Sequence, residues 1–237
     1  MIRLQQIRKR FGPLEILRGI DLDILPGRVT AIVGPNGAGK TTIIKMLLGL
    51  VKPDSGRIVW GEHTLNGDWR YRSRVGYMPQ IVRFPENLTG RELLEMITDL
   101  RGGEAAPDVE LVEAFRLERD LDKPFRTLSG GTRQKVNAAI AFRFRSDLLI
   151  LDEPTGGLDP VSTRALKAKV RKERDAGRAV VITSHNMSEL EALADDVAFL
   201  LDGVIRYRGT LEALKRETGE SDLEGAIARL MMREAAS

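Results

Sequence analysis

The sequence predicts an α/β fold with a parallel or mixed sheet, and three observations lead to this prediction. Residues 29–33 read Val-Thr-Ala-Ile-Val, a strand-forming run that leads through a glycine-rich loop into an apolar helical segment. Residues 148–151 form an unbroken apolar run, which is typical of a strand buried on both faces of a parallel sheet. A long helix over residues 161–175 is followed by another such strand over residues 179–183.

The glycine-rich loop after the first of these strands is the most specific motif in the chain. It fits G-x-x-x-x-G-K-[ST] with Gly34, Pro35, Asn36, Gly37, Ala38, Gly39, Lys40 and Thr41. Its glycines allow successive backbone N–H groups to turn toward phosphate oxygens at a helix N-terminus, whose dipole favours negative charge. The Lys40 ammonium can reach the terminal phosphates, and the Thr41 hydroxyl can bind Mg²⁺. The motif therefore predicts a P-loop that holds a nucleotide.

An antiparallel β segment of short strands joined by turns is expected in the N-terminal part of the chain. One of them covers residues 56–61, which lie between two glycines and follow a helix that ends near Gly49. Toward the other end, residues 197–207 are expected to form a hairpin turned at Asp202-Gly203. A helix over residues 221–232 is expected to close the chain.

The middle of the chain is predicted to be a helical insertion. Thr89 and Glu92 form a capping box that begins its first helix. A polar break at residues 102–107 precedes a second helix over residues 109–115, and a third helix runs from Ser129 toward Ser146. We therefore expect a nucleotide-binding domain over residues 1–215, with a core of residues 1–84 and 148–215 and a helical subdomain of residues 85–147, followed by a C-terminal helical extension over residues 216–237.

Two carboxylates follow the apolar strand of residues 148–151. Asp152 and Glu153 stand between four aliphatic residues and Pro154. A buried strand that delivers a carboxylate beside a P-loop supplies a partner for Mg²⁺, which predicts this role for Asp152. Glu153 lies one residue further out, where it can polarise the water that attacks a terminal phosphate. A plain surface pair of carboxylates at a strand end is the weaker alternative.

Composition limits what else the chain can be. With 237 residues, 42% hydrophobic and 30% charged, it is long enough to bury the core of one α/β domain. A net charge of +3 does not argue for nucleic acid as a partner. The absence of cysteine excludes disulfides and thiolate metal sites. The apolar runs are too short to span a bilayer and the N-terminus does not resemble a signal peptide, so we expect a cytoplasmic location.

Several further motifs occur in the order and spacing of one protein family. They are Gln80 in Tyr77-Met78-Pro79-Gln80, the signature Leu128-Ser129-Gly130-Gly131, Gly157-Leu158-Asp159 and His185. Together with the P-loop and the two carboxylates, they make residues 2–214 resemble the ATP-binding subunit of an ABC transporter. A P-loop alone would also suit kinases or GTPases, whereas the Leu-Ser-Gly-Gly signature followed by Asp-Glu-Pro-Thr does not.

The resemblance implies that the chain binds and hydrolyses ATP with Mg²⁺. In the family, the eight P-loop residues and the following Thr42 contact the nucleotide. The implied metal-binding residues are Thr41, Gln80 and Asp152. The implied catalytic residues are Glu153, Gln80 and His185. His185 matches the switch histidine that contacts the γ-phosphate, and a purely structural histidine is the alternative.

Two further implied contacts concern the rest of the nucleotide. Phe11 matches the aromatic residue that stacks on adenine, and a phenylalanine at the edge of the core is the alternative. Ser129, Gly130 and Gly131 match the anion site that faces the γ-phosphate held by a second copy, and Asp159 is expected to cross that interface. The family has glutamine where this chain has Thr132, which affects the fine geometry of the anion site.

The resemblance also implies partners. We expect a homodimer or a pseudo-symmetric heterodimer that binds a separate membrane permease at the inner face of the cell membrane. Residues 86–92 resemble the ATPases of two-component exporters, and residues 128–135 and 187–191 resemble the ATPase that supports copper-site assembly in nitrous oxide reductase. The alternative is a soluble ABC-type ATPase that acts on DNA or ribosomes. Members of that kind carry coiled-coil or zinc-binding insertions or a second cassette, and this sequence shows neither.

Overall fold

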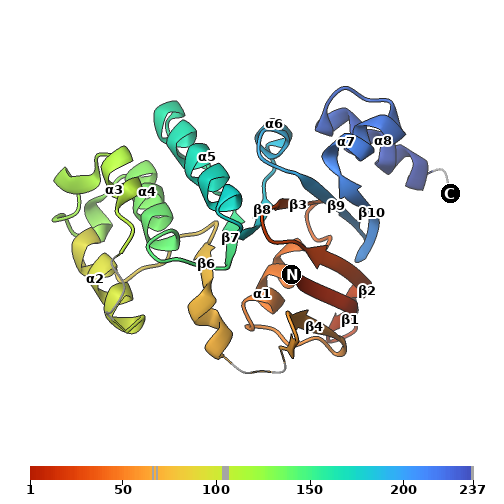
Figure 1. The fold of residues 1–237 in the computed structure, drawn as a ribbon, viewed down its shortest axis with the longest axis horizontal. Helices are drawn as coiled ribbons and strands as arrows, with labels where there is room; N and C mark the ends of the chain where they lie inside the picture. Colours follow the sequence, from red (N-terminus) through yellow and green to blue (C-terminus); the bar gives the residue numbers. More distant parts are fainter. Residues whose placement is uncertain (66, 68, 103–106, 236–237) are drawn as a thin grey trace.

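The computed structural model describes residues 1–65, 67, 69–102 and 107–235, and their strands form two sheets (Figure 1). The larger sheet consists, in spatial order, of β10 (Val204–Thr210), β9 (Asp196–Leu201), β3 (Val29–Val33), β8 (Ala179–Thr183), β7 (Leu148–Asp152) and β6 (Val75–Met78). Neighbouring strands are parallel from β9 to β6, and only β10 is antiparallel to its neighbour. The predicted mixed α/β sheet is therefore confirmed.

Strands β3 and β8 are buried along their whole length because both faces of the sheet are covered. In β3, Val29, Ala31 and Val33 belong to the core shared with the helices of the middle segment, whereas Ile32 belongs to the core shared with the smaller sheet. All five residues of β3 and of β8 are buried. Burial on two faces explains why runs of mostly apolar, β-branched residues predicted these strands correctly.

The smaller sheet is the expected antiparallel N-terminal segment, but its first two strands are longer than expected. In spatial order it consists of β2 (Leu14–Ile24), β1 (Ile2–Phe11), β4 (Ser55–Trp60) and β5 (His63–Thr64). The first two strands have 11 and 10 residues. Their pairing shifts register between Leu4 and Ile7, where Gln6 has φ 50°. This bulge interrupts the alternation of buried and exposed residues that reveals a long strand in a sequence.

Helices dominate the segment between β6 and β7, at one end of the molecule (Figure 1). They are α2 (Gly90–Leu100), α3 (Glu110–Ala114), η2 (Leu117–Arg119), η3 (Phe125–Thr127) and α4 (Gly130–Ala141). The predicted capping box begins α2, because the Thr89 hydroxyl accepts from the Glu92 N–H and the Glu92 carboxylate accepts from the Thr89 N–H. The expected polar break at residues 102–107 includes residues 103–106, which are not among the residues that the structure describes.

The helix expected from Ser129 toward Ser146 is α4, and it ends earlier than expected. Phe142 terminates it with φ −98° and ψ 2°, and the Phe142 side chain is buried. The Asp147 N–H then donates to the Arg74 carbonyl oxygen, one residue before β7 begins. A helix that continued to Ser146 would leave a single residue to lead the chain into the sheet. The need for a connection therefore shortens the helix.

The remaining helices are α1 (Lys40–Leu47), η1 (Arg70–Arg74), α5 (Pro160–Asp175), α6 (Met187–Glu191), α7 (Leu211–Thr218) and α8 (Leu223–Ala235). The predicted hairpin is β9 and β10, and its two-residue turn has positive φ at both Asp202 and Gly203. The chain's last expected helix is α8, and α7 before it was not predicted. A helix able to span a bilayer is not found in the described part of the chain.

Candidate nucleotide-binding site

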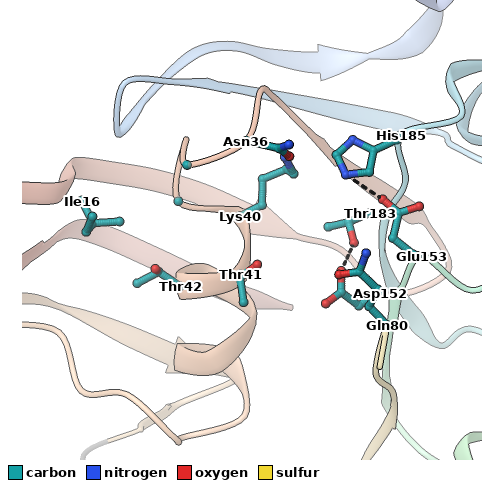
Figure 2. Close-up of a pocket in the computed structure, with 12 residues that line it drawn as sticks. Ile16, Asn36, Lys40, Thr41, Thr42, Gln80, Asp152, Glu153, Thr183 and His185 are labelled. Carbon is teal, nitrogen blue, oxygen red and sulfur yellow. Dashed lines mark hydrogen bonds and ion pairs between the residues drawn. The ribbon is translucent and has the colours of Figure 1, made fainter. Parts of the chain in front are cut away.

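A cavity of about 250 Å³ opens where the P-loop meets the carboxyl ends of the parallel strands (Figure 2). Its lining residues are Ile16, Asn36, Gly37, Gly39, Lys40, Thr41, Thr42, Gln80, Asp152, Glu153, Thr183 and His185. Figure 2 shows Lys40 and Thr41 on one side and Gln80, Asp152 and Glu153 on the other. The carboxyl ends of parallel strands are where open α/β sheets bind ligands. The fold thus brings five separate stretches of the sequence to one place.

Backbone geometry explains the glycines of the P-loop. Gly37 and Gly39 have φ 82° and 111°, which side chains disfavour. A Cβ atom on Gly34 would lie 2.1 Å from the Leu200 carbonyl oxygen, and one on Gly39 would lie 2.6 Å from Leu17 Cδ2. The loop therefore fits tightly against two strands at these glycines. The loop lines the cavity where α1 begins, and the N-terminus of a helix is suited to phosphate.

Lys40 is held at the mouth of this loop. Its ammonium donates to the carbonyl oxygens of Gly34 at 2.5 Å and Pro35 at 3.0 Å. Burial lowers the pKa of Lys40, and the charges of Glu153 and Asp152 act in the opposite direction. The ammonium thus lies between loop carbonyls and two carboxylates, where a phosphate oxygen can be bound.

The two carboxylates at the end of β7 are oriented by the neighbouring strand. The Thr183 hydroxyl donates to Asp152 at 2.5 Å. The Ser184 hydroxyl donates to Glu153 at 3.2 Å, and His185 Nε2 lies 3.5 Å from the other oxygen of that carboxylate. Glu153 has φ 51°, a left-handed conformation that is uncommon for a residue other than glycine. Backbone strain at a cavity wall is typical of a functional residue.

The donor set fits a Mg²⁺ ion that is shared with phosphates. Thr41, Gln80 and Asp152 all line the cavity and offer a hydroxyl, an amide and a carboxylate. In the part of the chain that the structure describes, no three His, Cys, Asp or Glu side chains form a metal site by themselves. Mg²⁺ is commonly held by one or two protein carboxylates together with substrate phosphates and water, so this limited set is sufficient.

Phe11 lies apart from the cavity lining. It ends β1, is 48% exposed, and has the Lys9 ammonium 5.3 Å from its ring centroid. An exposed ring of this kind is not a core residue, which disfavours the alternative of packing at the core edge. Its stacking on adenine stays a prediction.

The signature residues also lie outside the cavity, at the N-terminus of α4. The Ser129 hydroxyl accepts from the Thr132 N–H at 3.1 Å and lies 2.9 Å from the Thr132 hydroxyl. A Cβ atom on Gly131 would lie 2.9 Å from the Gly157 carbonyl oxygen, so the helix start packs closely on the loop that follows Glu153. Thr132, the departure from the family pattern, thus supports the serine through its hydroxyl.

Asp159 is engaged within its own chain. Its carboxylate accepts from the Ser162 N–H at 2.9 Å, which caps α5, and pairs with the Lys135 ammonium at 2.7 Å. Hydrogen bonds from Lys135 and Ser162 lower the pKa of Asp159. The side chain therefore joins α4 to α5, and the expected contact across a subunit interface stays a prediction.

Three residues near the cavity were missed from the sequence. Ile16 reaches the lining from β2, and Thr183 and Ser184 support the carboxylates from the end of β8. Thr183 pairs with Asp152 in the parallel register of β7 and β8. The sequence contained a signal for Thr183, because it is a polar residue that ends an apolar strand. The neighbouring strand ends in carboxylates, which such a residue can support.

Comparison with known proteins identifies related chains. A model of the ABC transporter family matches residues 17–156. The daunorubicin resistance ATP-binding protein DrrA3 of Streptomyces coeruleorubidus is 36% identical over 92% of this chain and 71% of its own length. The lantibiotic transport ATP-binding protein SrtF of Streptococcus pyogenes is 34% identical over 86% of this chain and 89% of its own length. The phospholipid-transporting ATPase ABCA3 of Homo sapiens is 36% identical over 91% of this chain, which spans 13% of that protein.

Solved structures share the fold. The structure of an ATP binding subunit of an ABC transporter superimposes with a TM-score of 0.89 at 28% identity, covering 98% of this chain and 99% of the other. The dimeric structure of MJ0796, a bacterial ABC transporter cassette, gives a TM-score of 0.80 at 23% identity over 89% of this chain and 99% of that one. The second likeness shows the fold alone.

Proposed function

The chain belongs to the ABC transporter family of ATP-binding domains, and from this premise we propose that it hydrolyses MgATP to energise a separate membrane permease. One observation carries the proposal. A single cavity is lined by Lys40 and Thr41 of the P-loop on one side and by Asp152, Glu153 and His185 on the other. This arrangement supplies phosphate binding, a metal ligand and a water-activating carboxylate within one small volume.

Each side chain has a distinct task in the proposed reaction. The P-loop N–H groups and the Lys40 ammonium hold the phosphates, and Thr41, Gln80 and Asp152 hold Mg²⁺. When bound, Mg²⁺ neutralises phosphate charge and helps to align the terminal phosphate. Glu153 accepts a hydrogen bond from the attacking water and directs its lone pair toward the γ-phosphorus. His185, 58% exposed and beside Glu153, contacts the γ-phosphate from the open side.

The proposed working unit contains two copies of the cassette. Ser129, Gly130 and Gly131 present N–H groups at the start of α4 but do not line the cavity of their own chain. A second copy arranged head to tail would bring this anion site to the γ-phosphate, so that each ATP contacts both subunits. The cassette MJ0796, which has the same fold, is named as dimeric. An identical partner or a related one would satisfy this geometry.

The permease and its cargo are a finer proposal. Relatives named for daunorubicin resistance and lantibiotic transport support an exporter, as do the exporter-like residues 86–92. We place the cassette on the inner face of the cell membrane, bound to the permease. Similarity of residues 128–135 and 187–191 to the ATPase of nitrous oxide reductase maturation supports a link to copper-site assembly. Genes adjacent to that of this chain would test this link, because a six-helix permease and a periplasmic copper-site maturation protein are expected there.

The core of the proposal is tested by phosphate release from ATP. Wild-type protein should hydrolyse ATP only with Mg²⁺. Glu153→Gln should retain ATP binding, while its rate of ATP hydrolysis should fall by a factor of about 10²–10⁴. Lys40→Ala should fail earlier, at nucleotide binding. The exposed Glu113→Gln is the matched control for the loss of one carboxylate and should keep the wild-type rate. Wild-type turnover by Glu153→Gln would exclude Glu153 as the activating group.

A further inference from the structure

Two amide side chains are buried on the inner face of α4. Gln134 is 5% exposed and Asn137 is fully buried, one helical turn further along. Their buried neighbours in the helix, such as Val136 and Ala138, are apolar and belong to the core. A buried amide lowers stability unless its polar atoms find partners, so these two side chains are explained by what they contact.

The amides contact the two loops that carry proposed catalytic residues. Asn137 Nδ2 donates to the Pro79 carbonyl oxygen at 2.9 Å, directly before Gln80. Gln134 Nε2 lies 3.3 Å from the Pro154 carbonyl oxygen and 3.4 Å from that of Glu153. Asn137 Nδ2 also lies 3.4 Å from Gln134 Oε1, so the two amides are joined to each other.

We propose that the Gln134–Asn137 pair positions Gln80 and Glu153 according to the placement of α4. The inference rests on the proposed function, in which the N-terminus of α4 binds the nucleotide of a second copy. Because a helix moves as a rigid rod, engagement of Ser129 by that nucleotide displaces both amides together. The two loops follow through their backbone carbonyls, and the subunit's own site is set for hydrolysis.

The contact between α4 and the loop before Gln80 leaves one polar atom unpaired. Asn137 Oδ1 is buried and has no hydrogen-bond partner among the described residues. A buried acceptor of this kind needs an explanation, and the adjacent loop before Gln80 can supply a donor when it shifts. Asn137 is thus a positioning residue that acts through Gln80, and Gln134 is one that acts through Glu153.

The test is a double-mutant cycle on ATP turnover. Asn137→Leu, which removes the amide at similar volume, should lower kcat about tenfold with little change in KM. In a Gln80→Ala background it should cause no further loss, because its effect passes through Gln80. Val136→Ala, on the same helix and equally buried, is the control, and its effect should multiply with that of Gln80→Ala.

A second variant tests the same contact in case Asn137→Leu does not fold. Asn137→Asp keeps the shape but places a carboxylate oxygen against the Pro79 carbonyl, so it should also lower kcat and speed amide hydrogen exchange over residues 78–82. Thermal unfolding of both variants reports whether they fold. Unchanged kcat in both, or multiplicative effects with Gln80→Ala, overturns the coupling. Wild-type protein that does not hydrolyse ATP overturns the proposed function, and this inference with it.

Discussion

The Thr183 hydroxyl donates a 2.5 Å hydrogen bond to the Asp152 carboxylate, and the two residues are direct partners in the pairing of β7 and β8. Thr183 itself is buried. A metal-binding carboxylate that accepts such a bond has one oxygen fixed in direction, which leaves the other to face the cavity. The register of two parallel strands therefore determines the orientation of the proposed metal ligand.

Thr183→Val should weaken metal binding by removing this bond while keeping the side-chain shape. Loss of such a supporting contact typically costs 10–100-fold in metal affinity or activity. We expect the Mg²⁺ concentration for half-maximal ATP hydrolysis to rise about tenfold, with less change in kcat at saturating Mg²⁺. Thr183→Ser keeps the hydroxyl and should behave as wild type. Equal Mg²⁺ dependence in the valine and serine variants would contradict the role of the bond.

Strain at Glu153 leads to a prediction about stability. Its φ of 51° is easily adopted by glycine and disfavoured for alanine. Glu153→Gly and Glu153→Ala both remove the carboxylate and should both abolish turnover. We expect the glycine variant to have the larger free energy of unfolding, by about 1 kcal/mol, although glycine normally destabilises. Urea unfolding of the two variants measures this difference, and a more stable alanine variant would show that the residue is unstrained.

The main parallel strands and the carboxylate site could be predicted because their signals are local. Val29–Val33 is buried throughout and mostly apolar since both faces are covered, and the P-loop specifies its own backbone geometry. Ile16 could not be found this way, because only the pairing of distant strands brings it to the cavity. The bulge at Gln6 concealed the length of β1 for a related reason, since it disrupts the period on which sequence interpretation depends.

Phe11 offers a test of nucleotide affinity. Its exposed ring at the end of β1 is the proposed platform for adenine. Stacking of a base on an aromatic side chain is worth about 1–3 kcal/mol, so Phe11→Ala should raise the ATP dissociation constant about tenfold. Hydrolysis at saturating ATP should change less. Phe11→Tyr keeps the ring and should bind normally, whereas unchanged affinity in Phe11→Ala would assign the platform to another residue.

Docking of the permease is expected on the surface around residues 80–100. Phe84 packs edge to face on Phe125 with ring centroids 5.6 Å apart, so a charge there would disturb folding as well as docking. Ile81 is a cleaner probe because its side chain is 64% exposed. Ile81→Glu should leave the ATPase activity of the isolated chain intact and reduce permease-coupled transport. Leu50→Glu, equally exposed but outside residues 80–100, should transport normally, and coupled transport by Ile81→Glu would place docking elsewhere.

The last prediction concerns assembly and follows from the separation of the two phosphate-binding elements. The P-loop lines the cavity, whereas Ser129 begins α4 outside it, so one chain cannot surround the γ-phosphate with both. ATP should therefore bind two copies together, and hydrolysis should release them because it removes the bridging phosphate. In Glu153→Gln protein, light scattering should report dimer mass with MgATP and monomer mass with MgADP.

Adding Ser129→Arg should prevent this shift without preventing ATP binding, because the arginine side chain fills the space at the start of α4. Arg126→Ala, a change at an exposed residue just before the signature, is the control and should dimerise. A Glu153→Gln chain that stays monomeric at high concentration with MgATP, while the wild type hydrolyses ATP, would rule out a site shared between two copies.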